Sequence, residues 1–157
     1  MVRVIPLMSL QRTCRVPLGT RVVSLALLAT LVCGQPARYR ELRRVIDRNT
    51  GFAHMTRGVN MNTLYALRSC VRERDIPVMR DMLRDKDRIT RMAVSLVLAD
   101  MGGEGEQAVR ARLAEVEDVE ERMMLQDALG NLARRDYRPI LEFPMTGAER
   151  SRIHGCK

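Results

Sequence analysis

Two stretches of the sequence decide the fold. They are Asp87-Arg-Ile-Thr-Arg-Met-Ala-Val-Ser-Leu-Val-Leu-Ala-Asp-Met101 and Asp118-Val-Glu-Glu-Arg-Met-Met-Leu-Gln-Asp-Ala-Leu-Gly-Asn-Leu132. At an offset of 31 residues they align acid with acid, arginine with arginine and apolar with apolar side chains. The aligned pairs are Asp87 with Asp118, Arg91 with Arg122, Met92 with Met123, Val94 with Leu125, Val97 with Ala128, Leu98 with Leu129, and Met101 with Leu132. A fixed offset of this size is typical of repeat proteins, so we predict a helical repeat with a weaker third copy over 60–73.

Shorter helices are expected between these copies. Apolar residues recur at three- and four-residue spacing over 75–84 and over 104–116, which is the pattern of one buried helix face. Asp75 is suited to cap the first of them. Gly102 and Gly103 end the preceding helix, because glycine adopts a left-handed conformation without steric cost. The helix over 88–101 has almost no polar face, so its neighbours must cover it on several sides.

The first full unit resembles a known repeat. It runs through Leu83-Arg-Asp-Lys-Asp87, then Ile89-Thr-Arg-Met-Ala93, then Leu98-Ala-Asp-Met-Gly102. This succession is similar to the HEAT-type repeat, in particular the short variety of bilin-lyase-like repeats. The resemblance implies an all-α fold, a short α-solenoid of two to three antiparallel helix pairs over 59–136. A plain helical bundle is the alternative fold.

Composition narrows the class of protein. Of the 157 residues, 46% are hydrophobic, which excludes a disordered polyelectrolyte. The chain has three Tyr, two Phe and no Trp, which argues against a module that stacks nucleic-acid bases on aromatic rings. We expect a soluble globular domain with a core of Leu, Val, Ala and Met.

The net charge of +8 is concentrated at the N-terminal end. Residues 1–58 hold ten Arg and two acidic residues, whereas 59–136 hold 13 basic and 15 acidic ones. Arg12, Arg15 and Arg21 precede the apolar run 22–32, and small residues follow it. A basic region, an apolar run of this length and a small-residue exit are the parts of a secretory signal peptide. We therefore predict that 1–34 is a signal peptide and that the protein is exported, to the periplasm or outside the cell.

Two alternatives remain. One is an uncleaved run that serves as a short N-terminal membrane anchor, and the other is cleavage followed by lipidation at Cys33. After the leader, the predicted layout is a basic linker or cap helix over 35–58, the repeats over 59–136, and a C-terminal cap with a flexible tail over 137–157. An oxidising compartment permits a disulfide between Cys70 and Cys156. The competing interpretation of Cys70 is a small buried hydrophobe on a helix face.

No catalytic constellation is evident in the sequence. The two histidines, His54 and His154, lie in a glycine-flanked loop and in the C-terminal tail. A nucleophile needs a base within reach, and a structural zinc ion needs four ligands. We expect no enzyme activity, no metal and no cofactor.

Polar positions on the longer helices are the predicted partner-binding surface, because in HEAT-like stacks these helices line the concave face. The predicted contact residues are Arg88, Arg91, Ser95, Arg122 and Gln126. The competing interpretation is structural, since Asp87 with Arg91 and Asp118 with Arg122 have the four-residue spacing of ion pairs within a helix.

The segment 38–48 is basic and amphipathic, with Tyr39 and Leu42 on its apolar side. It suits contact with an anionic membrane or an acidic protein surface. The arginines predicted for that contact are Arg38, Arg40, Arg43, Arg44 and Arg48. A solvated cap helix is the alternative.

These features together predict an exported, non-enzymatic helical-repeat scaffold that binds a protein partner through its concave face. One alternative is a cytoplasmic nucleic-acid-binding HEAT-like protein. The acidic balance of 59–136 and the export signal argue against it. A second alternative, an accessory factor or lyase-like subunit of an enzyme system, is implied by the resemblance alone.

Overall fold

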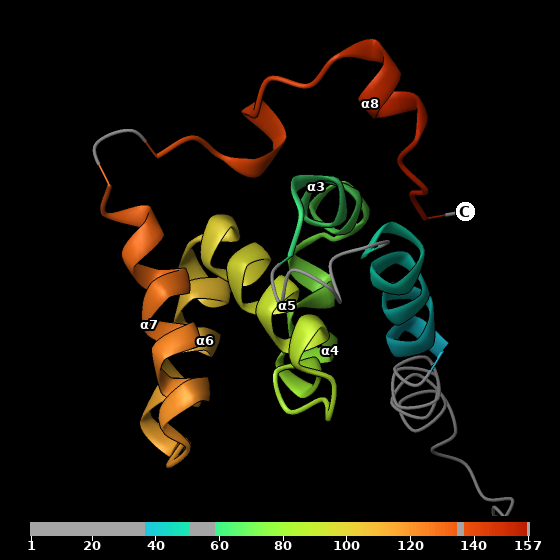
Figure 1. Cartoon of the computed structure of the whole chain (residues 1–157). Helices are drawn as coiled ribbons and strands as arrows, with labels where there is room; N and C mark the ends of the chain where they lie inside the picture. The colour runs from blue at the N-terminus through green and yellow to red at the C-terminus, as the bar shows by residue number, and fades with distance from the viewer. Residues whose placement is uncertain (1–36, 51–58, 135–136, 157) are drawn as a thin grey trace, which may run out of the picture. The chain divides into compact units, whose positions relative to one another are not determined.

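The computed structural model describes residues 37–50, 59–134 and 137–156, and every regular element in these ranges is helical (Figure 1). A helix covers 37–50. The elements after it are α3 (Met61–Cys70), η1 (Glu73–Asp75), α4 (Ile76–Met82), α5 (Arg88–Met101), α6 (Gly103–Glu115), α7 (Val119–Leu132), η2 (Ile140–Glu142) and α8 (Gly147–Ser151). The all-α prediction is confirmed for this part of the chain. The predicted signal peptide over 1–34 lies outside it.

The longer helices and the shorter helices form two rows that pack against each other. Helix α5 contacts both α3 and α7 in one row, and α4 contacts α6 in the other. Helix α5 also packs against α4 and α6, so neighbours surround it. Every residue of α5 is accordingly buried or half-buried, as its almost unbroken apolar sequence predicts. The completely buried side chains of this core include Leu67, Met79, Met82, Val94, Leu98, Val109 and Leu125.

The helix over 37–50 contributes to the same core. Its Leu42 and Ile46 are completely buried and belong to the apolar cluster that includes α3, α4 and α5. The segment therefore has one buried apolar side. Burial of these two large aliphatic side chains stabilises its packing by about 3–6 kcal/mol before the entropy of ordering is subtracted.

The two copies of the repeat begin in the same way. The carboxylate of Asp87 accepts a hydrogen bond from the backbone N–H of Thr90 (2.9 Å), and that of Asp118 accepts one from the N–H of Glu121 (2.7 Å). Each aspartate thus caps the first turn of its helix and satisfies an N–H that has no partner within the helix. At the other end of α5, Gly102 has φ 66°, which confirms the expected glycine stop.

Two local predictions need correction. Asp75 makes no side-chain cap on α4, because the chain enters α4 from η1 already in a helical conformation, so its carboxylate accepts from Arg38 instead. The tail predicted as flexible over 137–157 has fixed contacts in its described part. The side chain of Asn49 exchanges two hydrogen bonds with the backbone of His154, 105 residues later (2.9 and 3.0 Å).

Candidate binding pocket

The structure separates the five predicted partner-binding residues. Ser95 is completely buried and its hydroxyl donates to the carbonyl oxygen of Met92, so it cannot reach a partner. Arg88 forms an ion pair with Glu120 across α5 and α7 (3.1 Å). Gln126 is exposed on α7. The five residues therefore do not make one continuous polar stripe.

Arg91 and Arg122, the remaining two, have the same structural role in their two units. Arg91 donates to the carbonyl oxygen of Asp85 (2.7 Å), and Arg122 donates to that of Val116 (2.9 Å), six residues back in each case. Neither forms the expected ion pair with the aspartate four residues before it, because both aspartates cap their helices. Each arginine thus stabilises the turn between the short and the long helix of its unit by a hydrogen bond to a backbone carbonyl.

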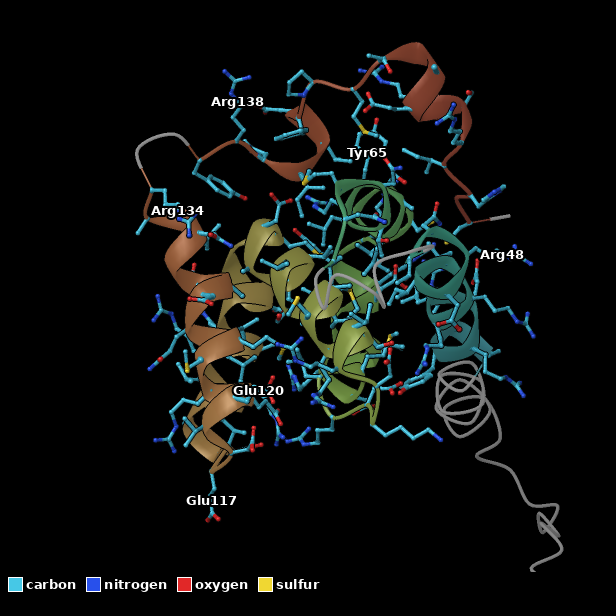
Figure 2. All side chains as sticks on the ribbon, viewed as in Figure 1. Arg48, Tyr65, Glu117, Glu120, Arg134 and Arg138 are labelled. Atoms are coloured by element: carbon cyan, nitrogen blue, oxygen red, sulfur yellow. The ribbon has the colours of Figure 1, made fainter. Side chains whose placement is uncertain are left out.

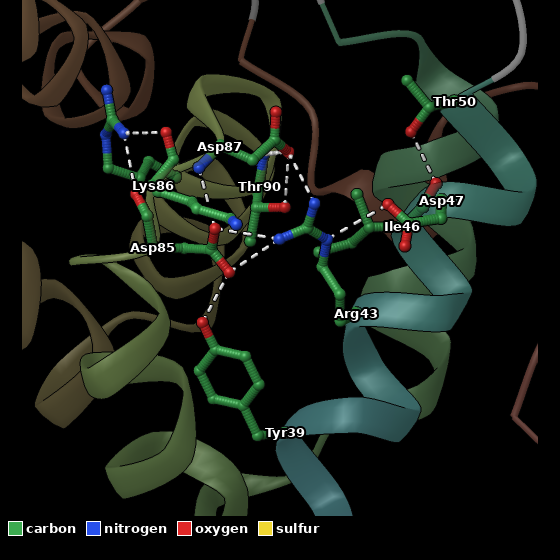
Figure 3. Close-up of polar contacts among 10 residues, drawn as sticks. Tyr39, Arg43, Ile46, Asp47, Thr50, Asp85, Lys86, Asp87 and Thr90 are labelled. Atoms are coloured by element: carbon green, nitrogen blue, oxygen red, sulfur yellow. Dashed lines mark hydrogen bonds and ion pairs between the residues drawn. The ribbon is translucent and has the colours of Figure 1, made fainter.

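The basic helix turns two of its five arginines inward. Arg43 donates two hydrogen bonds to the carboxylate of Asp85 (2.8 and 2.9 Å) and is paired with Asp47 at 3.1 Å, as Figure 3 shows. Tyr39 donates to the same Asp85 carboxylate. Arg38 pairs with Asp75 at 2.9 Å and donates to the carbonyl oxygen of Cys70 at 2.8 Å. The expectation that Arg38 and Arg43 contact a membrane is therefore not met, since both fasten the helix to the repeats.

Burial and hydrogen bonding act in opposite directions on the carboxylates of this contact. Burial raises the pKa of Asp85, but hydrogen bonds from Tyr39, from the N–H of Asp87 and from Arg43 lower it more, so the pKa lies below its ordinary value. The pKa of Asp75 is lowered in the same way, with burial opposed by Arg38 and the N–H of Arg72. Burial and the bond to Asp85 raise the pKa of Tyr39 to about 12. Asp75 and Asp85 are therefore ionised partners of the two arginines at neutral pH.

Arg40, Arg44 and Arg48 are the other three arginines of this helix, and all are exposed. Their four-residue spacing places them in one row, and Figure 2 shows Arg48 extending away from the helix. These three residues keep the predicted capacity for anionic contact.

A pocket of about 580 Å³ lies where α3, α5 and α7 meet the segment after α7. Its floor is apolar, with Leu64 from α3, Leu96 from α5 and Ala128 from α7. The wall is formed by the chain after α7, chiefly Ile140 and Phe143. Pockets of this size with mostly apolar linings are the usual sites for small ligands or for short peptide segments.

Asp100 holds the wall of the pocket in place. One carboxylate oxygen accepts from Arg68 of α3 (2.8 Å), and the other accepts from the hydroxyl of Tyr137 and the N–H of Ile140 (2.8 Å for the latter). Its side chain is only 3% exposed. Burial and the bond to Asp100 raise the pKa of Tyr137 far above its ordinary value, so the phenol stays protonated and keeps donating. Both oxygens of Asp100 are thus occupied, and the pocket presents no unpaired acceptor there.

Positive charge marks the edge of the pocket. Arg134, at the end of α7, and Arg138, in the segment that follows, both line it and are exposed (Figure 2). Neither guanidinium group has a hydrogen-bond or ion-pair partner among the described residues. Neither arginine was predicted from the sequence, because the wall and the floor come from parts of the chain whose proximity no local pattern reveals. The only local signal was Asp100, a carboxylate within an otherwise apolar helix end.

Metal centres and membrane spans are two other kinds of candidate site. No group of three or more His, Cys, Asp or Glu side chains within 37–50, 59–134 and 137–156 is arranged to hold a metal ion. No helix in these ranges is both long and apolar enough to cross a membrane. Comparison with known protein families, with curated proteins and with solved structures finds no match to this chain.

Proposed function

We propose that this protein is an exported, non-enzymatic binding protein, built as a short α-solenoid of HEAT-like helix pairs, which holds a protein partner against the face formed by α3, α5 and α7. The solenoid assignment is supported by the equivalent roles of Asp87 and Asp118 as caps and of Arg91 and Arg122 as turn fasteners. Units that repeat both sequence and contacts are expected of stacked helix pairs.

The observation that carries the binding proposal is the pocket on this face. An apolar interior, with two guanidinium groups at its edge that have no side-chain partner among the described residues, is complementary to an apolar segment that ends in a carboxylate. In a protein partner, a C-terminal carboxylate that follows apolar residues has this combination of groups. Arginine suits this role because its planar fork binds both oxygens of a carboxylate.

Peptide binding tests the pocket directly. The probe is a fluorescein-labelled hexapeptide ending in Val-Leu-Phe with a free carboxylate, titrated by fluorescence polarisation and compared with the same peptide amidated at its C-terminus. We expect amidation to weaken binding about tenfold, and Arg134→Ala with Arg138→Ala to weaken the free-acid peptide to a similar degree. Arg150→Ala with Arg152→Ala, which removes two exposed arginines that do not line the pocket, serves as the matched control.

Three outcomes would count against this proposal. Equal binding of the acid and the amide, or no effect of the Arg134 and Arg138 substitutions, would remove the carboxylate from the recognition. Binding of a long-chain fatty acid with the same arginine dependence, together with no peptide binding, would replace the protein partner with a small amphipathic ligand.

Export has its own test, which is the mass of the protein recovered from its native host. A chain that begins near Gln35 supports the proposed leader. A chain that retains 1–34 and fractionates with the cytoplasm contradicts it and returns the nucleic-acid alternative to consideration.

The exposed row of Arg40, Arg44 and Arg48 favours a second activity, contact with an anionic membrane surface. Co-sedimentation with vesicles that contain phosphatidylglycerol measures it. Substituting the three arginines with Gln is expected to lower the bound fraction, whereas substituting Arg150 and Arg152 is not. Equal binding to uncharged phosphatidylcholine vesicles would contradict this contact.

A further inference from the structure

Two cysteines lie against each other although 86 residues separate them. Cys70 is the last residue of α3, and Cys156 lies near the end of the chain. The backbone N–H of Cys156 donates to the sulfur of Cys70 at 2.7 Å. Both are free thiols and both are half-buried. Each cysteine is therefore positioned beside the other rather than exposed alone.

Neighbouring groups fix this proximity. The two hydrogen bonds between Asn49 and the backbone of His154 hold the chain two residues before Cys156. From the other side, Arg38 donates to the carbonyl oxygen of Cys70 and lies 3.8 Å from the sulfur of Cys156. The contacts come from the helix over 37–50, from α3 and from the tail, so three separate parts of the chain converge on this pair. Such positioning raises the effective concentration of one thiol at the other.

We propose that Cys70 and Cys156 are an oxidisable pair, and that a disulfide between them ties the C-terminal segment to the end of α3. The oxidant is a disulfide, either a small one such as oxidised glutathione or that of an oxidoreductase. The Cys70 thiolate attacks it, forms a mixed disulfide and releases one thiol. Cys156 then loses its proton, attacks the Cys70 sulfur and releases the second thiol.

The balance of this reaction is complete. The two protein thiols lose two protons and two electrons, and the oxidant disulfide becomes two thiols. Burial and the neighbouring Cys70 thiol raise the pKa of Cys156 to about 12, which is why the first attack is assigned to Cys70. The proposal does not depend on the peptide site, although the tied segment includes the pocket wall at Ile140 and Phe143.

Peptide mapping of the full chain tests the pairing. The protein is incubated in a glutathione buffer poised to the oxidised side, blocked with iodoacetamide and digested with trypsin without reduction. We expect a linked species made of Ser69-Cys-Val-Arg72 and Ile153-His-Gly-Cys-Lys157 that disappears on reduction. The double variant Cys14→Ser, Cys33→Ser is expected to give the same species, because neither substituted thiol takes part.

Stability and rate provide the second measurement. Closing a loop of this length is expected to raise Tm on the order of 10 °C relative to the reduced protein, and Cys156→Ser is expected to abolish the difference. Asn49→Ala removes both hydrogen bonds to His154 and is expected to slow formation of the bond about tenfold, with helicity by circular dichroism as the check that the chain still folds.

Three results would overturn the proposal. One is alkylation of both Cys70 and Cys156 after oxidation. Another is linkage of either cysteine to Cys14 or Cys33, and the third is formation of the bond at an unchanged rate in folded Asn49→Ala. Failure of the peptide-binding test leaves these measurements unaffected, so the two proposals stand or fall separately.

Discussion

Helices α5 and α7 have the same length of 14 residues and similar sequence patterns, yet they lie in different surroundings. Eight residues of α5 are buried and none is exposed, whereas α7 buries only Met124, Leu125 and Ala128. Val119 and Met123 of α7 are 69% and 59% exposed. The difference arises because α5 packs against α3, α4, α6 and α7, whereas the main contacts of α7 are with α5 and α6. A repeated pattern therefore specifies the helix but not how much of it is covered.

The two units also differ at the turn before the long helix. In the first unit Asp85 occupies this turn and binds Tyr39 and Arg43 of the helix over 37–50. The equivalent position of the second unit is Val116, which is buried and apolar. The shared feature is only the backbone carbonyl that Arg91 or Arg122 binds. Asp85 forms an ionic contact because the helix over 37–50 packs against the turn of the first unit. At the corresponding turn of the second unit, the apolar side chain of Val116 is buried instead.

The largest expected contrast is between Leu98 and its repeat equivalent, Leu129. Leu98 is completely buried, so Leu98→Ala leaves a cavity and is expected to lower the free energy of unfolding by about 3 kcal/mol. Leu129 is only half-buried, so the same truncation is expected to cost about 1 kcal/mol. Urea unfolding followed by circular dichroism measures both. Equal losses would show that α7 is covered in solution as fully as α5.

Two glycines provide the next contrast. A Cβ on Gly105 would lie 2.4 Å from the carbonyl oxygen of Leu98, because α6 crosses α5 closely there. Gly105→Ala is therefore expected to destabilise the protein by about 1–3 kcal/mol. A Cβ on Gly130 in α7 would meet no neighbouring atom within 4 Å. Gly130→Ala is therefore expected to stabilise the protein by about 0.5–1 kcal/mol, because alanine favours the helical conformation more than glycine does. Thermal unfolding distinguishes the two, and a loss of stability in both variants would contradict the open outer side of α7.

Acid sensitivity is expected to reside in the first unit. The pKa values of Asp75, Asp85 and Asp87 all lie below their ordinary value of 3.8. A carboxylate with a lowered pKa in the folded state contributes stability that is fully present above the unfolded value and is lost as the pH falls through the folded one. Stability should therefore fall steeply below about pH 4.

The variant Asp85→Asn checks this assignment. It is expected to lower stability at neutral pH by about 2 kcal/mol, because Arg43 and Tyr39 lose a charged acceptor, and to make the acid limb of the stability curve shallower. Urea midpoints measured from pH 7 down to pH 2.5 report both effects. An acid limb parallel to that of the unaltered protein would assign the titration to other groups.

The smallest effect is expected at Met123. Because its side chain is mostly exposed, Met123→Lys should change the free energy of unfolding by no more than about 0.5 kcal/mol. The equivalent Met92 packs against the core, so Met92→Lys should cost about 2 kcal/mol. Chemical unfolding of the pair is the measurement. A large loss for Met123→Lys would indicate that a partner or another copy of the chain covers α7.

Much of the helical layout follows from periodicity. The predicted range 88–101 coincides with α5, and the expected helix over 104–116 differs from α6 by one residue at each end. The glycine stop after α5 also follows from local chemistry. By contrast, the roles of Asp75 and Arg91 were mispredicted, because each could bind a local partner or a distant one and only packing selects between them.

The candidate pocket could not be predicted in the same way. Its floor is formed by helices that the sequence pattern predicts. Its wall at Ile140 and Phe143 is instead positioned by the hydrogen bond between Asp100 and the N–H of Ile140, which are 40 residues apart. The proximity of Cys70 and Cys156 is similar, since cysteine counting left them as the remaining pair after the leader and only the docked tail brings them together.

The sequence by itself determined that the described chain is helical, the bounds of α5 and, to within one residue, of α6, and which helix faces are apolar, because periodicity, capping and glycine chemistry act over a few residues. Only the tertiary structure decided which arginines fasten the fold and which stay exposed, where the pocket lies, and which thiols meet. Those outcomes depend on contacts between residues distant in the chain, and the free energy of such contacts is set by the final packing.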